Sequence, residues 1–188
     1  MYELGCLRNM KRNWVQFLNA DFANNSEHTF RVMWLALTIA KREGVESIEK
    51  VLKMALVHDV CESRSQDVHY LSRQYVTRHE EKSMDHMFED TALQDEMLAI
   101  WNEYEKRECI EAKIVKDADN LDCDLELKEQ EARGHTLDKQ FAKMRQVVAN
   151  EALYTETAKK FWNEIQNSNP HDWHLNGETR LKVGDKFQ

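Results

Sequence analysis

Histidine and aspartate residues recur in this 188-residue sequence in positions that favour a metal site. His28 stands near the start of an expected helix, and the pair His58-Asp59 ends a strongly apolar segment. Asp119 lies in a third segment, inside a long expected helix. Imidazole and carboxylate together suit Mn, Fe, Co, Ni or Zn. Consecutive residues on a helix point about 100° apart, so His58 and Asp59 can reach one ion only where the helix ends or is distorted.

Each of these residues also has a structural interpretation, and the pattern alone leaves both open. The apolar segment before His58-Asp59 places the pair near the core, where a buried acid needs a partner or a metal. On the pattern alone, a hydrogen-bonded buried pair is somewhat favoured over a metal site. His28 by itself is more often an ordinary residue at a helix start. Three nearby aspartates compete with Asp119 for the ligand role, namely Asp117, Asp122 and Asp124.

The elements that position these residues are expected to be helices. The chain has 5 glycines and 1 proline, too few for the many turns of a β-sandwich or barrel. Charged residues make up 32% of the chain, and Glu, Lys, Leu, Ala and Met are abundant, which favours helices. A length of 188 residues favours one domain. We therefore expect an all-α, single-domain bundle.

Apolar residues at helical spacing, together with capping signals, predict where the helices begin and end. Residues 1–24 are predicted to form one helix with an irregular exit, and residues 63–76 to be irregular or short-helical. Thr77 and Thr91 each open a helix, because Glu or Gln follows three residues later as in a capping box. Further helices are expected at 27–43, 48–58, 109–132 and 137–166, the first with Phe30, Met33, Trp34, Leu37 and Ala40 facing inward.

Charge and composition limit the partners of the chain. The formal net charge is -8 and no Lys/Arg block is present, which argues against binding to duplex nucleic acid. No apolar run approaches the roughly 18 residues of a membrane span, and no signal-peptide core is present. We expect a cytoplasmic protein with no membrane partner and reduced thiols. Its four cysteines form no CxxC pair; they are Cys6, Cys61, Cys109 and Cys123.

The four candidate ligands resemble the signature of the HD-domain superfamily of metal-dependent phosphohydrolases. That signature is a helical His, then a helical His-Asp pair, then a distant Asp. Within the superfamily, the chain looks most similar to the bacterial 5′-deoxynucleotidases and their eukaryotic HD-domain relatives. The resemblance covers roughly residues 8–165 and therefore implies an HD-domain helical bundle. It rests on residues 26–32, 55–62 and 113–119, together with Trp14 and Asp67.

The resemblance implies a role for each matching residue. The metal would be held by His28, His58, Asp59 and Asp119. Glu62 would be the acid/base residue near the attacking water, and Asp67 would contact the deoxyribose hydroxyl. Trp14 would wall the sugar pocket and disfavour a 2′-hydroxyl. On the pattern alone, Glu62 is more often a surface residue, and Trp14 is as often a core residue as a binding one.

Two positions depart from the family pattern. The bacterial enzymes have an arginine directly before the tryptophan, where this chain has Asn13, so Arg12 is the expected phosphate-binding residue. The family often has Gly-Asp where this chain reads Gln66-Asp67, a difference in the loop that bears on sugar selectivity. Lys116, one helical turn before the distant Asp, is a further candidate for substrate binding, although such a lysine is more often a plain surface residue.

The expected function is hydrolysis of (deoxy)nucleoside 5′-monophosphates to nucleoside and phosphate. A nucleotide is the expected small-molecule substrate, and the expected cofactor is a divalent ion among Mn, Co, Fe, Ni, Zn and Mg. One alternative is a nucleoside triphosphate phosphohydrolase on the same fold, which needs more cations around the substrate. Those would come from Arg64, Arg73, Arg78 and Lys82. A second alternative is a non-catalytic, metal-stabilised helical module.

The chain is expected to divide into a phosphohydrolase domain over residues 1–166 and a polar C-terminal tail over residues 167–188. The tail contains Pro170 and a second His-Asp pair, His171-Asp172, which we expect to be solvated. The resemblance also suggests a homodimer.

Overall fold

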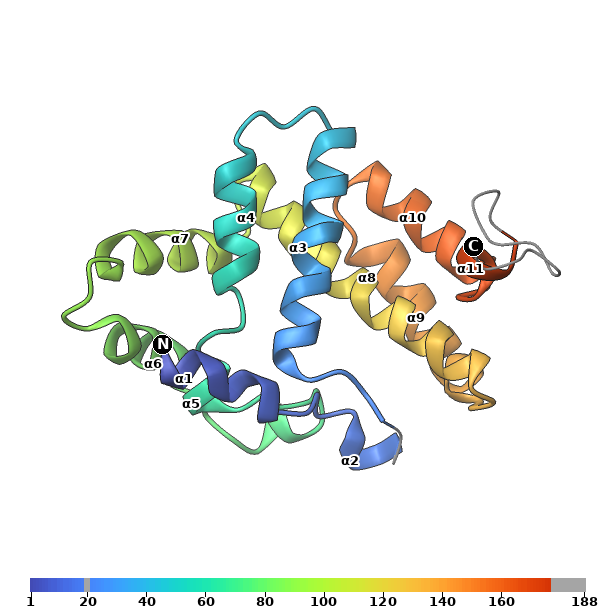
Figure 1. The fold of residues 1–188 in the computed structure, drawn as a ribbon, viewed down its shortest axis with the longest axis horizontal. Coiled ribbons are helices and arrows are strands. Elements are labelled where there is room, and N and C mark those ends of the chain that lie inside the picture. The colour runs from blue at the N-terminus through green and yellow to red at the C-terminus, as the bar shows by residue number, and fades with distance from the viewer. Residues whose placement is uncertain (19–20, 177–188) are drawn as a thin grey trace, which may run out of the picture.

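Three helices form the centre of the molecule. The computed structural model describes residues 1–18 and 21–176, and this part of the chain contains helices and no β-strand. Helix α3 (Asn25–Arg42) crosses α8 (Ile110–Ala132), and α4 (Ile48–Val57) packs beside both (Figure 1). The predicted all-α bundle is confirmed.

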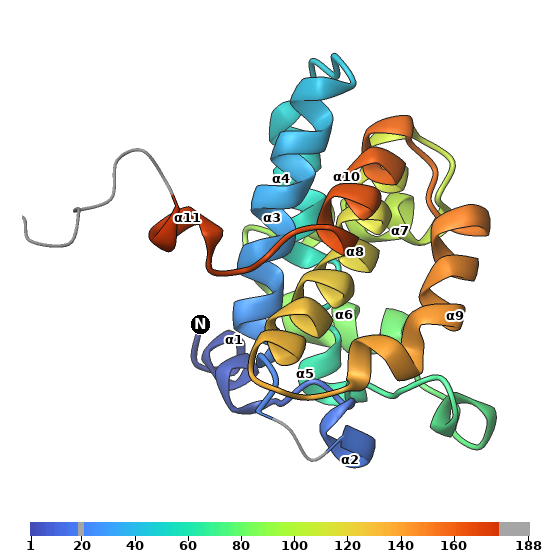
Figure 2. The same cartoon turned by 90° about the vertical axis from the view of Figure 1, so that its right-hand side faces the viewer.

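Two helical pairs flank this centre on opposite sides (Figures 1 and 2). On one side lie α6 (Glu80–Phe88) and α7 (Gln94–Lys106). On the other side lie α9 (Leu137–Glu151) and α10 (Glu156–Gln166). No helix in the described ranges is long and apolar enough to cross a membrane. The short elements are α1 (Tyr2–Gly5), η1 (Cys6–Asn9), α2 (Val15–Leu18), α5 (Glu62–Ser65), η2 (Ser72–Gln74) and α11 (Asp172–Leu175).

The inward face of α3 differs from the one predicted. Phe30 and Trp34 are 65% and 58% exposed, so the expectation that they face the core is wrong. Val32 and Ala36 are fully buried instead. These two residues follow His28 at helical spacing on the same stripe of α3, and His28 is itself fully buried. The side of α3 that carries the histidine therefore faces α8, and the larger aromatic residues are turned outward.

The N-terminal segment does not form the single helix that was predicted for residues 1–24. The chain is extended at Met10, and Lys11 forms an isolated β-bridge with Asn24. The backbone N–H of Arg12 donates to the carbonyl of Ala23 at 3.1 Å. These contacts hold residues 10–12 against the start of α3, which places Arg12 next to the candidate site.

A buried aspartate divides the helix that was predicted over residues 137–166. Asp117 on α8 accepts hydrogen bonds from the backbone N–H groups of Tyr154 and Thr155, both at 2.8 Å. The hydroxyl of Thr155 then accepts from the N–H of Ala158 and caps α10. No Gly or Pro marks this break, and Thr155 was not recognised as an N-cap residue within the continuous helical spacing. The break lets α10 turn back and pack on α8.

The capping boxes predicted at Thr77 and Thr91 are also wrong, although the two helices exist. The N-cap residues are His79 and Leu93, and neither makes a side-chain cap hydrogen bond. Residues 76–79 are not helical, so Thr77 lies before the helix and not at its N-cap position. A capping box does form at Asn24, whose side chain accepts from a backbone N–H of the first turn of α3.

Candidate active site

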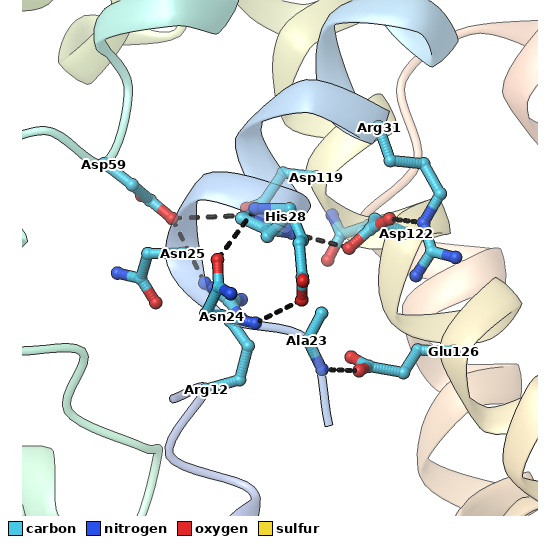
Figure 3. Close-up of polar contacts among 12 residues, drawn as sticks. Arg12, Ala23, Asn24, Asn25, His28, Arg31, Asp59, Asp119, Asp122 and Glu126 are labelled. Atoms are coloured by element: carbon cyan, nitrogen blue, oxygen red, sulfur yellow. Dashed lines mark hydrogen bonds and ion pairs between the residues drawn. The ribbon is translucent and has the colours of Figure 1, made fainter. Parts of the chain in front are cut away.

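The four predicted ligands come from three different helices and meet at one point. His28 lies in the first turn of α3, and Asp119 lies in the middle of α8. Helix α4 ends at Val57, so His58 and Asp59 occupy the turn that follows it. The two consecutive side chains can therefore reach the same point, as the sequence required of a shared site. Figure 3 shows His28 between Asp59 on one side and Asp122 on the other.

The spacing of the four side chains fits a single ion. One nitrogen or oxygen atom from each residue lies within 4.8 Å of the other three. His28 Nε2 lies 3.3 Å from His58 Nε2, 3.4 Å from Asp59 Oδ2 and 3.3 Å from Asp119 Oδ1. Ligand atoms bound at about 2.1 Å from a transition metal lie roughly 3.0–3.4 Å apart in octahedral or tetrahedral geometry. These separations from His28 are those expected of ligands around one metal ion.

The hydrogen bonds of the two histidines also fit a metal. His58 Nδ1 lies 2.8 Å from the carbonyl oxygen of Ala55, which only accepts, so Nδ1 carries the proton. His28 Nδ1 lies 2.6 Å from Asp122 Oδ2 and donates to that carboxylate. In the neutral rings, each Nε2 atom then carries a lone pair, and the two lone pairs point toward each other beside two carboxylate oxygens. Such an arrangement is repulsive unless a cation lies within it.

The charges of the cluster attract a cation. Burial opposes the charged form of His28, but its hydrogen bonds to three carboxylates raise its pKa well above the usual value. Burial also opposes ionisation of Asp119, but Lys116 and His28 bring the pKa of this carboxyl well below its usual value. The carboxylates therefore stay ionised. Without a metal, His28 takes up a proton. A divalent ion competes with this proton for the site.

Asp122 orients His28 from the side away from the cluster. It is buried, and its second oxygen accepts from Arg31 Nε. Arg31 NH1 in turn donates to Glu129 at 2.8 Å. The sequence did not distinguish Asp122 from the other acids of its helix. This chain of contacts fixes the ring and the protonated nitrogen of His28, as an outer carboxylate does in many metal sites.

Replacing Asp122 with asparagine is expected to weaken metal binding by about 10- to 100-fold. The amide keeps the shape of the side chain but removes the charge that holds the Nδ1 proton of His28. The dissociation constant for Mn²⁺ or Zn²⁺, measured by titration of chelator-stripped protein, checks this. Glu129→Gln is the matched control, because Glu129 contacts only Arg31 in this chain of contacts. Equal affinities for Asp122→Asn and wild type would show that Asp122 does not position the ligand.

Glu62 lies beside the cluster and is buried, with 3% of its surface exposed, in contrast to the surface position that the pattern favoured. Asn25 donates to its Oε2 at 2.6 Å, and Arg78 NH1 lies 3.6 Å from its Oε1. Burial and the neighbouring carboxylates of Asp59 and Asp67 raise the pKa of Glu62 to about 9. A bound divalent cation acts in the opposite direction. The environment of Glu62 therefore suits a group that exchanges protons.

The other predicted residues also reach the site. Arg12 is buried, and its NH1 lies 3.2 Å from Asp59 Oδ2 and 3.6 Å from Asp67 Oδ2. Asp67 also accepts from the backbone N–H of Asn13 at 3.0 Å. Asn13 therefore contributes its backbone here, and the preceding Arg12 supplies the positive charge. Lys116 Nζ donates to Asp119 Oδ2 at 2.7 Å.

Two adjoining cavities meet at these residues. One, of about 120 Å³, lies over the ligand cluster and includes Glu62. The other, of about 260 Å³, includes Trp14, whose ring meets Phe141 edge-on at a centroid distance of 5.3 Å. Trp14 therefore both lines a cavity and packs against a neighbour. The residues shared by the two cavities are Arg12, Asp67, Arg73, Lys116 and Asp119.

The cations considered for a triphosphate separate into two groups. Arg73 and Arg78 line the cavity over the ligands. Arg64 and Lys82 line a different cavity, and Arg64 donates to Glu3 at 2.6 Å. Arg107, which the sequence did not single out, also lines the cavity over the ligands. The second His-Asp pair, at residues 171–172, is exposed as predicted.

Gln66 holds Asp67 in place through an unfavourable backbone conformation. It ends α5 with φ 68° and ψ 150°, a region that glycine occupies readily and other residues rarely adopt. Its backbone N–H donates to the carbonyl of Glu62 at 2.9 Å, so the turn links two site residues. The glycine that the family often has at this position would fit the same turn.

Replacing Gln66 with glycine is expected to stabilise the protein, because it removes strain of about 1–3 kcal/mol from the folded state. The greater freedom of glycine in the unfolded chain offsets about 0.5–1 kcal/mol of that gain. The midpoint of thermal unfolding should therefore rise by a few degrees, at roughly 2–4 °C per kcal/mol for a chain of this size. Gln66→Ala, which keeps the strain, should show no such rise. A lower midpoint for Gln66→Gly than for Gln66→Ala would contradict the strained turn.

Comparisons with known proteins agree with this arrangement. The HD domain family matches residues 4–162 of the chain. The 5′-deoxynucleotidase HDDC2 of Danio rerio is 34% identical over 134 residues, which cover 68% of this chain and 66% of that protein, just under two thirds of its length. The named activity is that of the relative.

Two solved structures share the fold. A protein from Pyrococcus horikoshii OT3 has a TM-score of 0.68 and 26% identity, over 88% of this chain and 94% of that one. A protein from Magnetospirillum magnetotacticum, named a predicted metal-dependent phosphohydrolase, has a TM-score of 0.66 over 88% of this chain and 89% of that one. At 23% identity, this second likeness shows the fold alone. With the family match over most of its length and a His/Asp cluster able to bind a metal, the chain belongs to the HD-domain family and has a single HD-domain bundle.

Proposed function

We propose that the chain hydrolyses deoxynucleoside 5′-monophosphates to deoxynucleoside and phosphate. The observation that carries this proposal is the junction of the two cavities at Arg12 and Asp67. One cavity lies over the ligand cluster and suits a phosphoryl group, and the other runs past Trp14 and suits a nucleoside. The relative from Danio rerio is named a 5′-deoxynucleotidase, which supports the same substrate class.

The proposed metal ligands are His28, His58, Asp59 and Asp119. A divalent ion held by them would supply Lewis-acid chemistry, lowering the pKa of water and offsetting negative charge on the phosphoryl group. Two imidazoles and two carboxylates suit several metals, so Mn, Co, Fe, Ni, Zn and Mg are all candidates for the ion.

Glu62 is proposed to take the proton from the attacking water. Asn25 holds one carboxylate oxygen of Glu62 at 2.6 Å, which fixes the plane of the group. The other oxygen, Oε1, then remains for the water. Because Glu62 is buried, its carboxylate is a stronger base than an exposed glutamate, and general base catalysis of this kind contributes about 10²- to 10⁴-fold.

Arg12 and Lys116 are proposed to contact the phosphoryl oxygens. Both line the two cavities, so both lie where the phosphate must join the nucleoside. Only NH1 of Arg12 approaches Asp59 and Asp67, and the remaining donors of the guanidinium suit a phosphate.

Asp67 and Trp14 are proposed to recognise the sugar. Asp67 Oδ2 is fixed by the N–H of Asn13, which leaves Oδ1 to accept from a deoxyribose hydroxyl. Trp14 is held edge-on by Phe141 and offers a rigid wall beside that position. Such a wall offers a 2′-hydroxyl no hydrogen-bond partner, which disfavours ribonucleotides by up to about 10²-fold.

The volume over the cluster favours a monophosphate over a triphosphate. The cavity over the ligands measures about 120 Å³, less than half of the 260 Å³ of the cavity past Trp14. The smaller cavity suits one phosphoryl group. Arg73 and Arg78 line the cavity and favour the triphosphate alternative, but Arg78 already pairs with Glu80 at 2.7 Å.

A substrate panel tests the proposal. Phosphate release is measured from deoxy- and ribonucleoside mono-, di- and triphosphates, with Mn²⁺, Co²⁺, Mg²⁺ or Zn²⁺ added to chelator-stripped protein. The highest kcat/KM is expected for deoxynucleoside monophosphates. Faster release from triphosphates, or equal rates for ribo- and deoxynucleotides, would contradict the proposed substrate.

The division into a domain over residues 1–166 and a tail over residues 167–188 stays a prediction, as does the homodimer. A truncation after residue 166 that keeps full activity would support the division. The mass of the particle in solution, measured by light scattering, would test the homodimer.

A further inference from the structure

Arg107 stands out because its backbone adopts a conformation that arginine rarely takes. It ends α7 in the left-handed region, with φ 55° and ψ 25°, where glycine is the usual residue. Its guanidinium carbon lies 3.4 Å from the centroid of the Tyr104 ring, in a stacked contact. Tyr104 in turn meets the ring of His58 edge-on. The strained backbone therefore places a cation one aromatic ring away from a proposed metal ligand.

The pairing of Arg107 differs from that of three of the four other cations in the cavity over the ligands, while the fourth, Arg73, donates to the carbonyl of Val68. Three of those cations have a carboxylate oxygen within about 3.2 Å: Arg12 with Asp59, Arg78 with Glu80 and Lys116 with Asp119. Arg107 meets the exposed Glu105 only at 3.4 Å. Its NH1 is buried and has no hydrogen-bond partner in the described part of the chain. Carboxylates therefore neutralise the guanidinium of Arg107 less than they neutralise the other three cations, which favours an anion in the cavity.

The position of Arg107 defines which part of a substrate it would meet. Arg107 and Tyr104 line the cavity over the ligands but not the cavity past Trp14. A nucleoside lying against Trp14 would direct its phosphoryl group toward the ligand cluster and Arg107. Guanidinium groups bind phosphoryl oxygens through two N–H donors in one plane.

We propose that Arg107 binds the phosphoryl group of the substrate, at the end of the cavity remote from the nucleoside. This inference rests on the proposed function, since it assumes that a phosphate occupies the cavity over the ligands. It adds a second guanidinium to the cavity that Arg12 also lines.

Inorganic phosphate is a direct probe, because its binding does not require turnover. Its dissociation constant is measured by calorimetry on the metal-loaded protein, for wild type, Arg107→Gln, Arg107→Lys and Arg107→Gly. We expect each substitution to weaken binding by about 10-fold or more, with Lys losing less than Gln because it keeps the charge. The inhibition constant of phosphate should rise in parallel, with KM affected more than kcat.

Arg107→Gly separates the side chain from the fold. Glycine suits the left-handed conformation, so this variant should keep its cooperative thermal unfolding and its metal content while losing phosphate affinity. Arg64→Gln is the matched control, since Arg64 pairs with Glu3 and lines a different cavity. Phosphate affinity within two-fold of wild type in Arg107→Gly and Arg107→Gln would overturn the inference. Failure of the proposed function would appear instead in the substrate panel, with phosphate binding intact.

Discussion

Replacing His58 with alanine is expected to remove metal binding and phosphate release together. His58 Nε2 lies 3.3 Å from His28 Nε2 and 3.3 Å from Asp59 Oδ2, at the centre of the proposed ligand set. Without His58, three ligand atoms remain, and the negative charges of the two carboxylates are less well compensated. Activity should fall to the background of the assay. Metal content by mass spectrometry and phosphate release from a deoxynucleoside monophosphate, both on the purified variant, check this result.

The second His-Asp pair supplies a matched control for this experiment. His171→Ala removes the histidine of the other His-Asp pair. His171 is exposed, is the N-cap residue of the short helix α11, and lies outside the ligand cluster. It should retain both metal and activity. A His58→Ala protein that keeps the metal content of wild type would contradict the assigned ligand set, whatever its activity.

Replacing Glu62 with glutamine is expected to lower kcat by about 10²- to 10⁴-fold while the metal content stays that of wild type. Glutamine keeps the size of the side chain and its contact with Asn25, but it cannot accept a proton from water. Single-turnover phosphate release in the presence of saturating metal measures the loss directly.

The stability of the metal-free variant distinguishes lost chemistry from lost structure. The pKa of Glu62 is raised to about 9, so at neutral pH the metal-free protein already holds this carboxyl in its protonated form. A group with a raised pKa favours the folded state most at low pH and loses that contribution as the pH rises through the folded pKa. Neutral glutamine resembles the protonated form, so Glu62→Gln should unfold at or above the temperature of wild type at pH 7. Retention of more than a tenth of the wild-type kcat would show that Glu62 is not the base.

The sequence predicted more of the candidate site than of the helices that carry it. His28, His58, Asp59 and Asp119 were identified because their types suit a metal and their segments match a known family, and the structure brings them together. Asp122 was missed because α8 carries several acids at helical spacing, and only the position of α3 decides which of them meets a histidine.

Arg107 was missed for a related reason. An arginine at the end of a helix is usually a surface residue, and nothing in the local sequence shows that its backbone turns left-handed. Its contact with Tyr104 arises from that turn, and its place in the cavity depends on how α7 packs against α8. The contact with Tyr104 follows from a local backbone conformation that the residue types do not indicate, and the place in the cavity is tertiary, so spacing along the chain could not reveal either.

The errors in the helices have the same origin. The predicted helix over residues 137–166 has continuous helical spacing, yet Asp117 on another helix takes the N–H groups that would continue it. Phe30 and Trp34 have the apolar character of core residues, but the buried stripe of α3 is the one that carries His28. In each case a polar residue of the core determined the local structure against the apolar pattern.

The most direct test of the central claim is a metal titration of chelator-stripped protein, with bound metal and phosphate release from a deoxynucleoside monophosphate measured in the same samples. We expect no release without metal, and a rate that rises with bound metal and levels off as the site fills. Release at the full rate from metal-free protein, or a filled site with no release from any phosphate ester, would contradict it.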